Sequence, residues 1–175
     1  MKYFKNVFVQ TGFFAGVASG IVTIVLFLLF RYTGSGIFDG IFTVDFFITF
    51  PFIVACLYYI RKRRDELRIW QSIVLGAVTV FTSLAFYMIF VLVFTEFIDP
   101  NYFAESILLK LKELKEIEVA MSSSEEYKEE FANKYPEMKA MIKSLSIGSL
   151  LVGKLIFHTI AGTIYTLFMA ILFRK

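Results

Sequence analysis

The sequence predicts an all-α polytopic membrane protein, with four transmembrane helices in an antiparallel bundle and an extracytoplasmic helical hairpin between helices three and four. Two observations predict this fold. Hydrophobic residues occupy 58% of the 175 positions and mean hydropathy is +0.70, whereas a soluble domain is usually about 45–50% apolar. Charged residues make up 19% of the chain and gather in a few short stretches. This distribution excludes a soluble globular domain and a disordered chain.

Four segments reach the length of about 20 mostly apolar residues that a transmembrane helix requires. They cover about residues 7–30, 41–60, 69–94 and 147–173, and the helical insert occupies about 95–146. Together they form one integral membrane domain, residues 1–175. The first segment is longer than a signal-peptide core of about 7–15 residues, so we interpret it as a spanning helix rather than a cleaved leader.

The distribution of Lys and Arg predicts the orientation of these helices. One side of the predicted membrane has nine basic residues beside only Asp65 and Glu66. The nine are Lys2, Lys5, Arg61, Lys62, Arg63, Arg64, Arg68, Arg174 and Lys175. The insert has seven lysines and eleven acidic residues, a net charge of −4. Because basic residues favour the cytoplasmic flanks, we expect both termini in the cytoplasm and the insert outside.

Helical signals recur along the insert. Apolar residues at three- and four-residue spacing over 104–121 predict an amphipathic helix. Asp99 and Pro100 fit its N-cap and first helical position. Ser122 and Ser123, with Glu125 and Glu126 three residues later, fit capping boxes that open a second helix. Pro136 predicts the start of a third helix that continues into the fourth span.

The first span has a face of small residues, because Gly12, Gly16 and Gly20 recur at intervals of four. Such a pattern lets another helix approach closely in a bilayer. It could serve packing within the bundle or a seam with a second copy or another subunit. The fourth span offers small residues of its own, so pairing of the first and fourth helices would use both. These residues are Gly148, Gly153, Ala161, Gly162 and Thr166.

Three ionisable residues lie within the predicted spans: Asp45, Lys154 and His158. Such residues are costly in a membrane and often functional. Asp45 and Lys154 lie about 6 and 10 Å from the outer helix ends, at about 1.5 Å per residue, and Lys154 shares a helix face with His158. They could form a buried ion pair with a hydrogen-bonded histidine, or a proton or anion path from outside. Lys154 could instead extend its ammonium group toward the interface.

Other chemistry is sparsely represented. One histidine and the single cysteine, Cys56, are too few for a metal site, and no disulfide can form within the chain. We expect no catalytic residues, no cofactor and no nucleic-acid partner. Pro51 predicts a kink in the second span. The basic cluster at 61–64 could attract anionic lipid at about 1 kcal/mol per residue, although the positive-inside rule alone accounts for it.

Several local features together resemble one known family. They are the basic stretch 59–67, Trp70-Gln71-Ser72, Gly76, Phe86-Tyr87, the exit 97–102, the glycines of the first span and the terminal Arg174-Lys175. Over nearly its whole length the chain resembles the four-helix membrane proteins of Bacteroidota catalogued as domain-of-unknown-function family 4199. The resemblance implies the same topology and the inner membrane of a Gram-negative bacterium. It implies no activity and no functional residues.

Three functional hypotheses follow. The first is a structural or accessory subunit that binds a membrane partner, either another copy or a larger protein, through the insert or the glycine-rich face. The alternative is an oligomeric transporter or channel subunit that uses the line of Asp45, Lys154 and His158. A membrane enzyme with His158 as its base is the least favoured. In every case the lipid bilayer is the surrounding partner.

Overall fold

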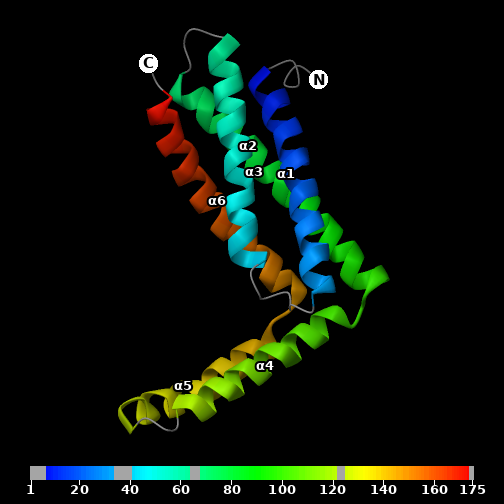
Figure 1. The fold of residues 1–175 in the computed structure, drawn as a ribbon, viewed down its shortest axis with the longest axis vertical. Helices are drawn as coiled ribbons and strands as arrows, with labels where there is room; N and C mark the ends of the chain where they lie inside the picture. Colours follow the sequence, from blue (N-terminus) through cyan, green and yellow to red (C-terminus); the bar gives the residue numbers. More distant parts are fainter. Residues whose placement is uncertain (1–6, 34–40, 64–67, 122–124, 174–175) are drawn as a thin grey trace.

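The computed structural model describes residues 7–33, 41–63, 68–121 and 125–173, although not the side chains of 41–46, 121 and 125–133. Over these residues the fold is all-α (Figure 1). The helices are α1 (Val7–Tyr32), α2 (Ile41–Arg63), α3 (Ile69–Val93), the π-helical turn η2 (Phe94–Ile98), α4 (Tyr102–Met121), α5 (Glu125–Ser144) and α6 (Ile147–Leu172).

Three helices in the described part of the chain are long and apolar enough to cross a membrane: Val7–Tyr32, Ile69–Ile98 and Ile147–Leu172. They coincide with the first, third and fourth segments that the sequence predicts. Their outer faces are apolar as well, since Phe14 on α1 and Ile164 on α6 are 70% and 64% exposed. An apolar surface of this kind is typical of helices that face lipid.

The helix α3 lies at the centre of the bundle, and α1, α2 and α6 all pack against it (Figure 1). The most extensive contact joins α1 to α3, and these two helices run in the same direction. The helix α6 runs antiparallel to α3. Two clusters of buried apolar side chains fill the interior, one around Leu57 and Leu75 and one around Phe27 and Val91.

The glycine face of α1 packs against α3, so the predicted pairing of the first and fourth helices is wrong. A Cβ atom on Gly16 would lie 2.5 Å from the Cβ of Thr82, and one on Gly12 would lie 2.8 Å from the carbonyl oxygen of Leu75. A Cβ on Gly20 would lie 2.9 Å from the Cβ of Phe86. Only glycine permits this approach, which maximises the dispersion contact that holds helices together in lipid.

The small residues of α6 do not act as one face. Gly162 lies against Val80, and Thr166 lies where a side chain on Gly76 would be, so both pack on α3. Gly153 has no neighbouring atom within 4 Å of the position a Cβ would take. Because α3 offers small residues of its own to two sides, α1 and α6 both pack against α3.

The exit from α3 differs from the sequence prediction. The helix continues past residue 94 as η2, where the hydroxyl of Thr95 donates to the carbonyl of Val91 at 2.8 Å. Asp99 ends this turn, and α4 begins at Tyr102. The predicted N-cap at Asp99 with helical Pro100 is therefore two residues early, because the π-helical turn occupies the chain up to Ile98.

The predicted helix start at Pro136 is also wrong. The helix α5 passes through Pro136 and ends at Ser144, and α6 begins after Ser146. Ser146 has an extended backbone, with φ −117° and ψ 158°, and its hydroxyl accepts a hydrogen bond from the backbone N–H of Ser149 at 3.1 Å. This N-cap satisfies a free N–H and separates the two helices. The predicted capping serines, Ser122 and Ser123, lie outside the described residues.

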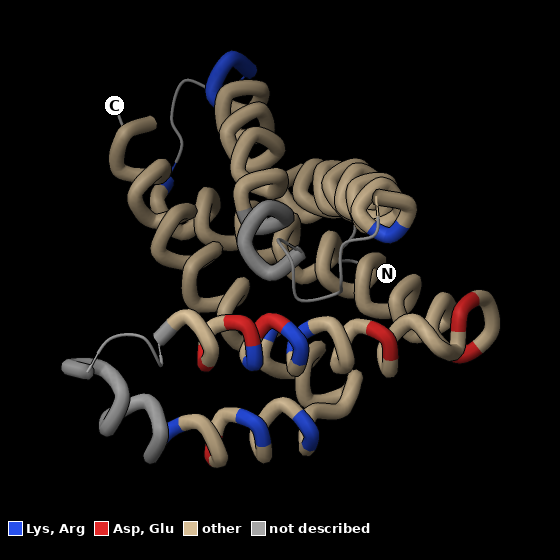
Figure 2. The backbone as a smooth tube through the Cα atoms, turned by 60° about the horizontal axis from the view of Figure 1, so that its bottom comes forward, with Lys and Arg blue, Asp and Glu red and all other residues tan. Residues whose placement is uncertain are grey.

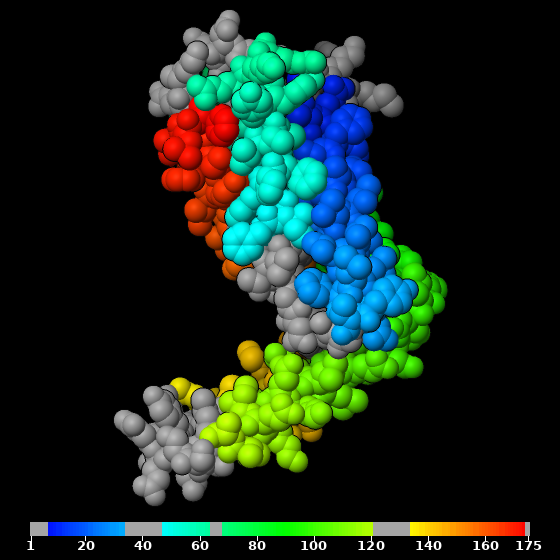
Figure 3. Space-filling view, in the orientation of Figure 1, coloured from blue at the N-terminus to red at the C-terminus, as the bar shows by residue number. Residues whose placement is uncertain are grey.

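The helices α4 and α5 lie side by side, run in opposite directions and project obliquely from one end of the bundle (Figures 1 and 3). We call this pair, residues 102–144, the arm. Described Lys, Arg, Asp and Glu residues gather on the arm and at the ends of the bundle helices (Figure 2). The fold therefore separates an apolar bundle from a charged arm.

Candidate functional site

A lysine is buried between α3 and α6. Lys154 on α6 is 1% exposed, and its Nζ atom lies 3.7 Å from the centroid of the Tyr87 ring on α3. A cation over an aromatic face is attracted by the ring quadrupole, by about 2 kcal/mol when both groups are desolvated. The side chain therefore points into the bundle, and its burial contradicts the interpretation in which Lys154 extends toward the interface.

His158 lies one turn further along α6 and is 4% exposed. Its Nδ1 atom is 3.0 Å from the carbonyl oxygen of Lys154. Because a carbonyl oxygen only accepts hydrogen bonds, Nδ1 must carry the proton, which fixes the tautomer of a neutral ring. The interpretation of Lys154 and His158 as structural residues predicted such a hydrogen bond for His158.

A chain of three buried hydroxyl groups joins α1, α2 and α3. The hydroxyl of Ser83 on α3 donates to the hydroxyl of Ser19 on α1 at 3.1 Å, and Ser19 donates to the hydroxyl of Thr49 on α2 at 3.1 Å. Ser19 is fully buried. Such interhelical hydrogen bonds typically contribute about 0.6 kcal/mol each in a membrane. The chain of hydroxyls therefore fixes the register of α1, α2 and α3.

At the arm end of the bundle, Arg31 joins α1 to the start of the arm. Its Nη2 atom lies 2.7 Å from Oδ2 of Asp99 and 3.3 Å from Oε2 of Glu105, and Nε donates to the same Asp99 oxygen at 2.8 Å. The guanidinium carbon lies 4.8 Å from the centroid of the Tyr102 ring, whose residue is 1% exposed. We call these four residues the Arg31 clamp.

An aromatic cluster connects the buried lysine with this clamp. Phe27 on α1 is 1% exposed and meets four rings edge to face. The centroid distances are 6.1 Å to Tyr87, 5.7 Å to Phe90, 5.2 Å to Phe94 and 5.6 Å to Tyr102. Each such pair contributes about 0.5–1.5 kcal/mol beyond its buried area. The cluster therefore packs the base of the arm firmly against the bundle.

The predicted site residues come together only in part. The structure brings Lys154 and His158 to one face of α6, and it places Gly12, Gly16 and Gly20 in the α1–α3 contact. Asp45 belongs to the first turns of α2, but its side chain lies outside the described part of the chain. The ion pair between Asp45 and Lys154 therefore stays a prediction.

The sequence predicted neither the contact of Arg31 with Asp99 nor that of Lys154 with Tyr87. Arg31 and Asp99 are 68 positions apart, so no local pattern could pair them. Tyr87 gave a clearer signal, since a tyrosine deep in an apolar segment needs a polar neighbour for its hydroxyl.

Among the described residues, no group of three or more His, Cys, Asp and Glu side chains lies close enough together to hold a metal ion. The buried polar side chains described above are instead engaged by rings, hydroxyls and backbone carbonyls. Such contacts hold helices in place. Fold and site together define the class of protein: a helical membrane protein with a charged arm.

The chain matches a family model over residues 10–175, and the family is described as "Protein of unknown function (DUF4199)". The chain belongs to this family. The match confirms the resemblance drawn from the basic second loop and the exit around Asp99 and Pro100. Comparisons with curated proteins and with solved structures gave no significant match.

Proposed function

We propose that this protein is a non-catalytic accessory subunit of the bacterial inner membrane, which crosses the bilayer four times and binds a larger membrane protein through its arm. One observation carries the proposal. The arm presents exposed apolar side chains among charged ones, while the Arg31 clamp holds it against the bundle.

The length and position of α2 support four spans. Its 20 residues before Arg61 give a helix of about 30 Å at about 1.5 Å per residue, which matches the hydrocarbon thickness of about 30 Å. It packs beside α1 and α6. Its last turn contains Arg61, Lys62 and Arg63, so the positive-inside rule puts this end and both termini in the cytoplasm and the arm outside.

The exposed apolar residues of the arm support the proposal that it binds another protein. Leu108, Val119 and Met141 are 66%, 64% and 70% exposed. Lipid would cover such residues on the bundle, but on an extramembrane element they favour a protein contact. The glycine-rich face, which is the other predicted contact surface, is already covered by α3.

The Arg31 clamp and the aromatic cluster support binding by a preformed surface. Tyr102 is buried where the Arg31 clamp meets the aromatic cluster, against both Arg31 and Phe27. The first turn of α4 is therefore fixed to α1 and η2. An arm held in one orientation loses less conformational freedom when it binds.

Site-specific photo-cross-linking in native membranes tests the proposal. A photoreactive residue at Leu108 should give one discrete cross-linked protein, identified by mass spectrometry. The matched control is Ile164 on the apolar face of α6, which is 64% exposed and should give lipid adducts. Lipid adducts alone at Leu108 would show that the arm rests on the membrane surface, and adducts that join two copies of the chain alone would indicate a homo-oligomer. Either result would overturn the proposal.

Burial of Lys154 favours a second candidate, an oligomeric transporter or channel subunit, because intramembrane ionisable residues often mark ion paths. Four helices are few for such a path, so several copies would be needed. The ring of Tyr87 and the backbone hydrogen bond of His158 account for both residues without transport, so we favour the accessory role. Proteoliposome flux that is unchanged when Lys154 and His158 are both replaced by Leu would exclude transport through this line.

A further inference from the structure

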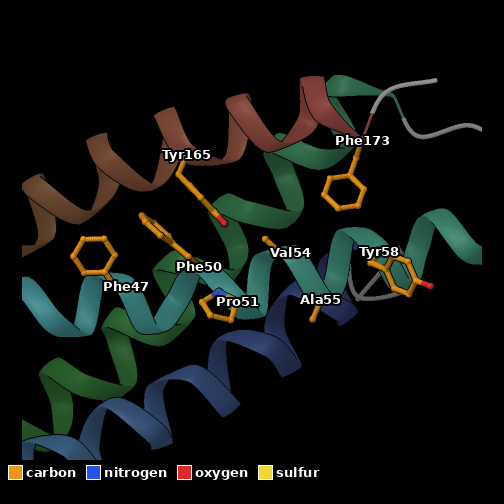
Figure 4. A pocket seen from close by; sticks show the side chains of 8 residues that line it. All are labelled: Phe47, Phe50, Pro51, Val54, Ala55, Tyr58, Tyr165 and Phe173. Carbon is orange, nitrogen blue, oxygen red and sulfur yellow. The ribbon is translucent and has the colours of Figure 1, made fainter.

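An apolar groove of about 550 Å³ opens between α2 and α6 on the outside of the bundle (Figure 4). Phe50 and Tyr165 bridge the two helices with stacked rings, whose centroids are 3.7 Å apart. Beside this stack the groove is lined by the short side chains of Pro51, Val54 and Ala55. Its volume falls within the range of about 300–1,000 Å³ that is usual for small-molecule sites.

The length of the groove matches one leaflet of a bilayer. Its lining extends along α2 from Phe47 to Tyr58 (Figure 4), which corresponds to about 16 Å at about 1.5 Å per helical residue. Half of the hydrocarbon core of a membrane is about 15 Å. The groove can therefore accommodate one acyl chain that lies along the helix axis.

One end of the groove is basic. Phe173 lines this end, and the guanidinium carbon of Arg61 lies 5.8 Å from the centroid of its ring. Lys62 and Arg63 follow in the same last turn of α2. A basic residue beside the membrane attracts an anionic headgroup by about 1 kcal/mol.

We propose that this groove binds one anionic phospholipid of the leaflet at the Arg61 end, with an acyl chain between α2 and α6 and the phosphate beside Arg61. Charge complementarity favours an anionic lipid, because a phospholipid supplies both an apolar chain and an adjacent anion in one molecule. The proposal goes beyond the accessory role and is independent of the arm.

Native mass spectrometry of the detergent-purified protein tests this site, with phosphatidylglycerol and phosphatidylcholine of identical acyl chains as probes. The wild type should retain one phosphatidylglycerol in preference to phosphatidylcholine. Arg61→Gln should weaken phosphatidylglycerol binding about fivefold, the equivalent of about 1 kcal/mol. The control is Arg68→Gln, which makes the same charge change at an exposed position that does not line the groove and should have little effect.

A substitution that fills the groove tests the contribution of the acyl chain separately from that of the headgroup. Ala55 is exposed and lines the groove, so Ala55→Trp should fold and lose the retained lipid, whereas Val22→Trp on the outer face of α1 should keep it. Equal binding of the two lipids, or equal effects of Arg61→Gln and Arg68→Gln, would overturn the proposal. A dimer in the wild-type spectrum that Ala55→Trp abolishes would also overturn it, since a second copy would then occupy the groove.

Discussion

Lys154 illustrates how single residues accommodate a charge inside this bundle. The ammonium group lies over Tyr87, and the backbone carbonyl of the same lysine receives the hydrogen bond of His158. The ring that contacts the lysine also packs against Phe27. The polar residues of α6 are thus integrated into the aromatic packing of α1 and α3.

A double-mutant cycle measures the contact between Lys154 and Tyr87. We expect Tyr87→Leu and Lys154→Met to show a coupling energy of about 1–2 kcal/mol, because each substitution removes the same desolvated cation–π contact. Unfolding in mixed detergent micelles gives the four free energies. Additive effects of the two substitutions would show that the contact contributes nothing to stability.

The glycine contact gives a prediction with an internal control. Gly16→Ala should destabilise the protein by about 1–3 kcal/mol, because its Cβ would overlap Thr82 and the backbone of α3. Gly153→Ala should be neutral or slightly stabilising, because its surroundings are open and alanine is the better helix former. Thermal unfolding in detergent compares the two. Equal shifts in Tm would contradict the close packing of α1 on α3.

Among the helices and turns, the junction of α3 with the arm depends on contacts between distant parts of the chain. The π-helical turn η2 extends α3, and Asp99 ends it within reach of Arg31 on α1. The ring of Tyr102, in the first turn of α4, then packs against Phe27 and the guanidinium of Arg31. The direction of the arm therefore depends on α1 as well as on its own connection to α3.

Loss of the Arg31 clamp should loosen this junction without unfolding the bundle. A partly exposed ion pair contributes about 0.2–1 kcal/mol, so Arg31→Gln should accelerate hydrogen exchange over residues 94–106 by up to about fivefold. Lys110→Gln is the control, since its 2.6 Å pair with Glu113 lies within α4. An increase in exchange of the same size in both variants would refute the role of the clamp.

The positions of the helices followed from the sequence more closely than their contacts did. Apolar segments of spanning length predicted α1, α3 and α6 because hydrophobic length is a local property. The partner of the glycine face was predicted incorrectly, since Gly12 and Gly16 show that a helix approaches but not which one. Pro136 shows a second limit, because the proline alone predicted a helix start, whereas α5 passes through Pro136 and α6 begins only after the N-cap at Ser146.

The candidate site was predictable only where its residues share one helix. Lys154 and His158 lie four positions apart, so helical periodicity placed them together. Arg31 and Asp99 meet only through the tertiary fold. The groove between α2 and α6 likewise depends on how two helices pack together, and the composition of neither helix encodes it.

For the whole molecule, separation of charge is the dominant feature. Away from its ends the described bundle is largely apolar, with Lys154 buried inside it, whereas the arm combines lysines and acids (Figure 2). The four-span proposal places the basic end of α2 on one side of the membrane and the arm on the other. The partner of the arm and the lipid of the groove would then act on opposite faces of the protein.

The most direct test of this account is the accessibility of single cysteines to a membrane-impermeant maleimide. In a Cys56→Ala background, cysteines replace the exposed residues Thr33, Lys62 and Lys139 one at a time. In intact spheroplasts the variants at Thr33 and Lys139 should react, and the variant at Lys62 should react only after permeabilisation. Reaction of the Lys62 and Thr33 variants from the same side would show that α2 does not cross the membrane and would contradict the account.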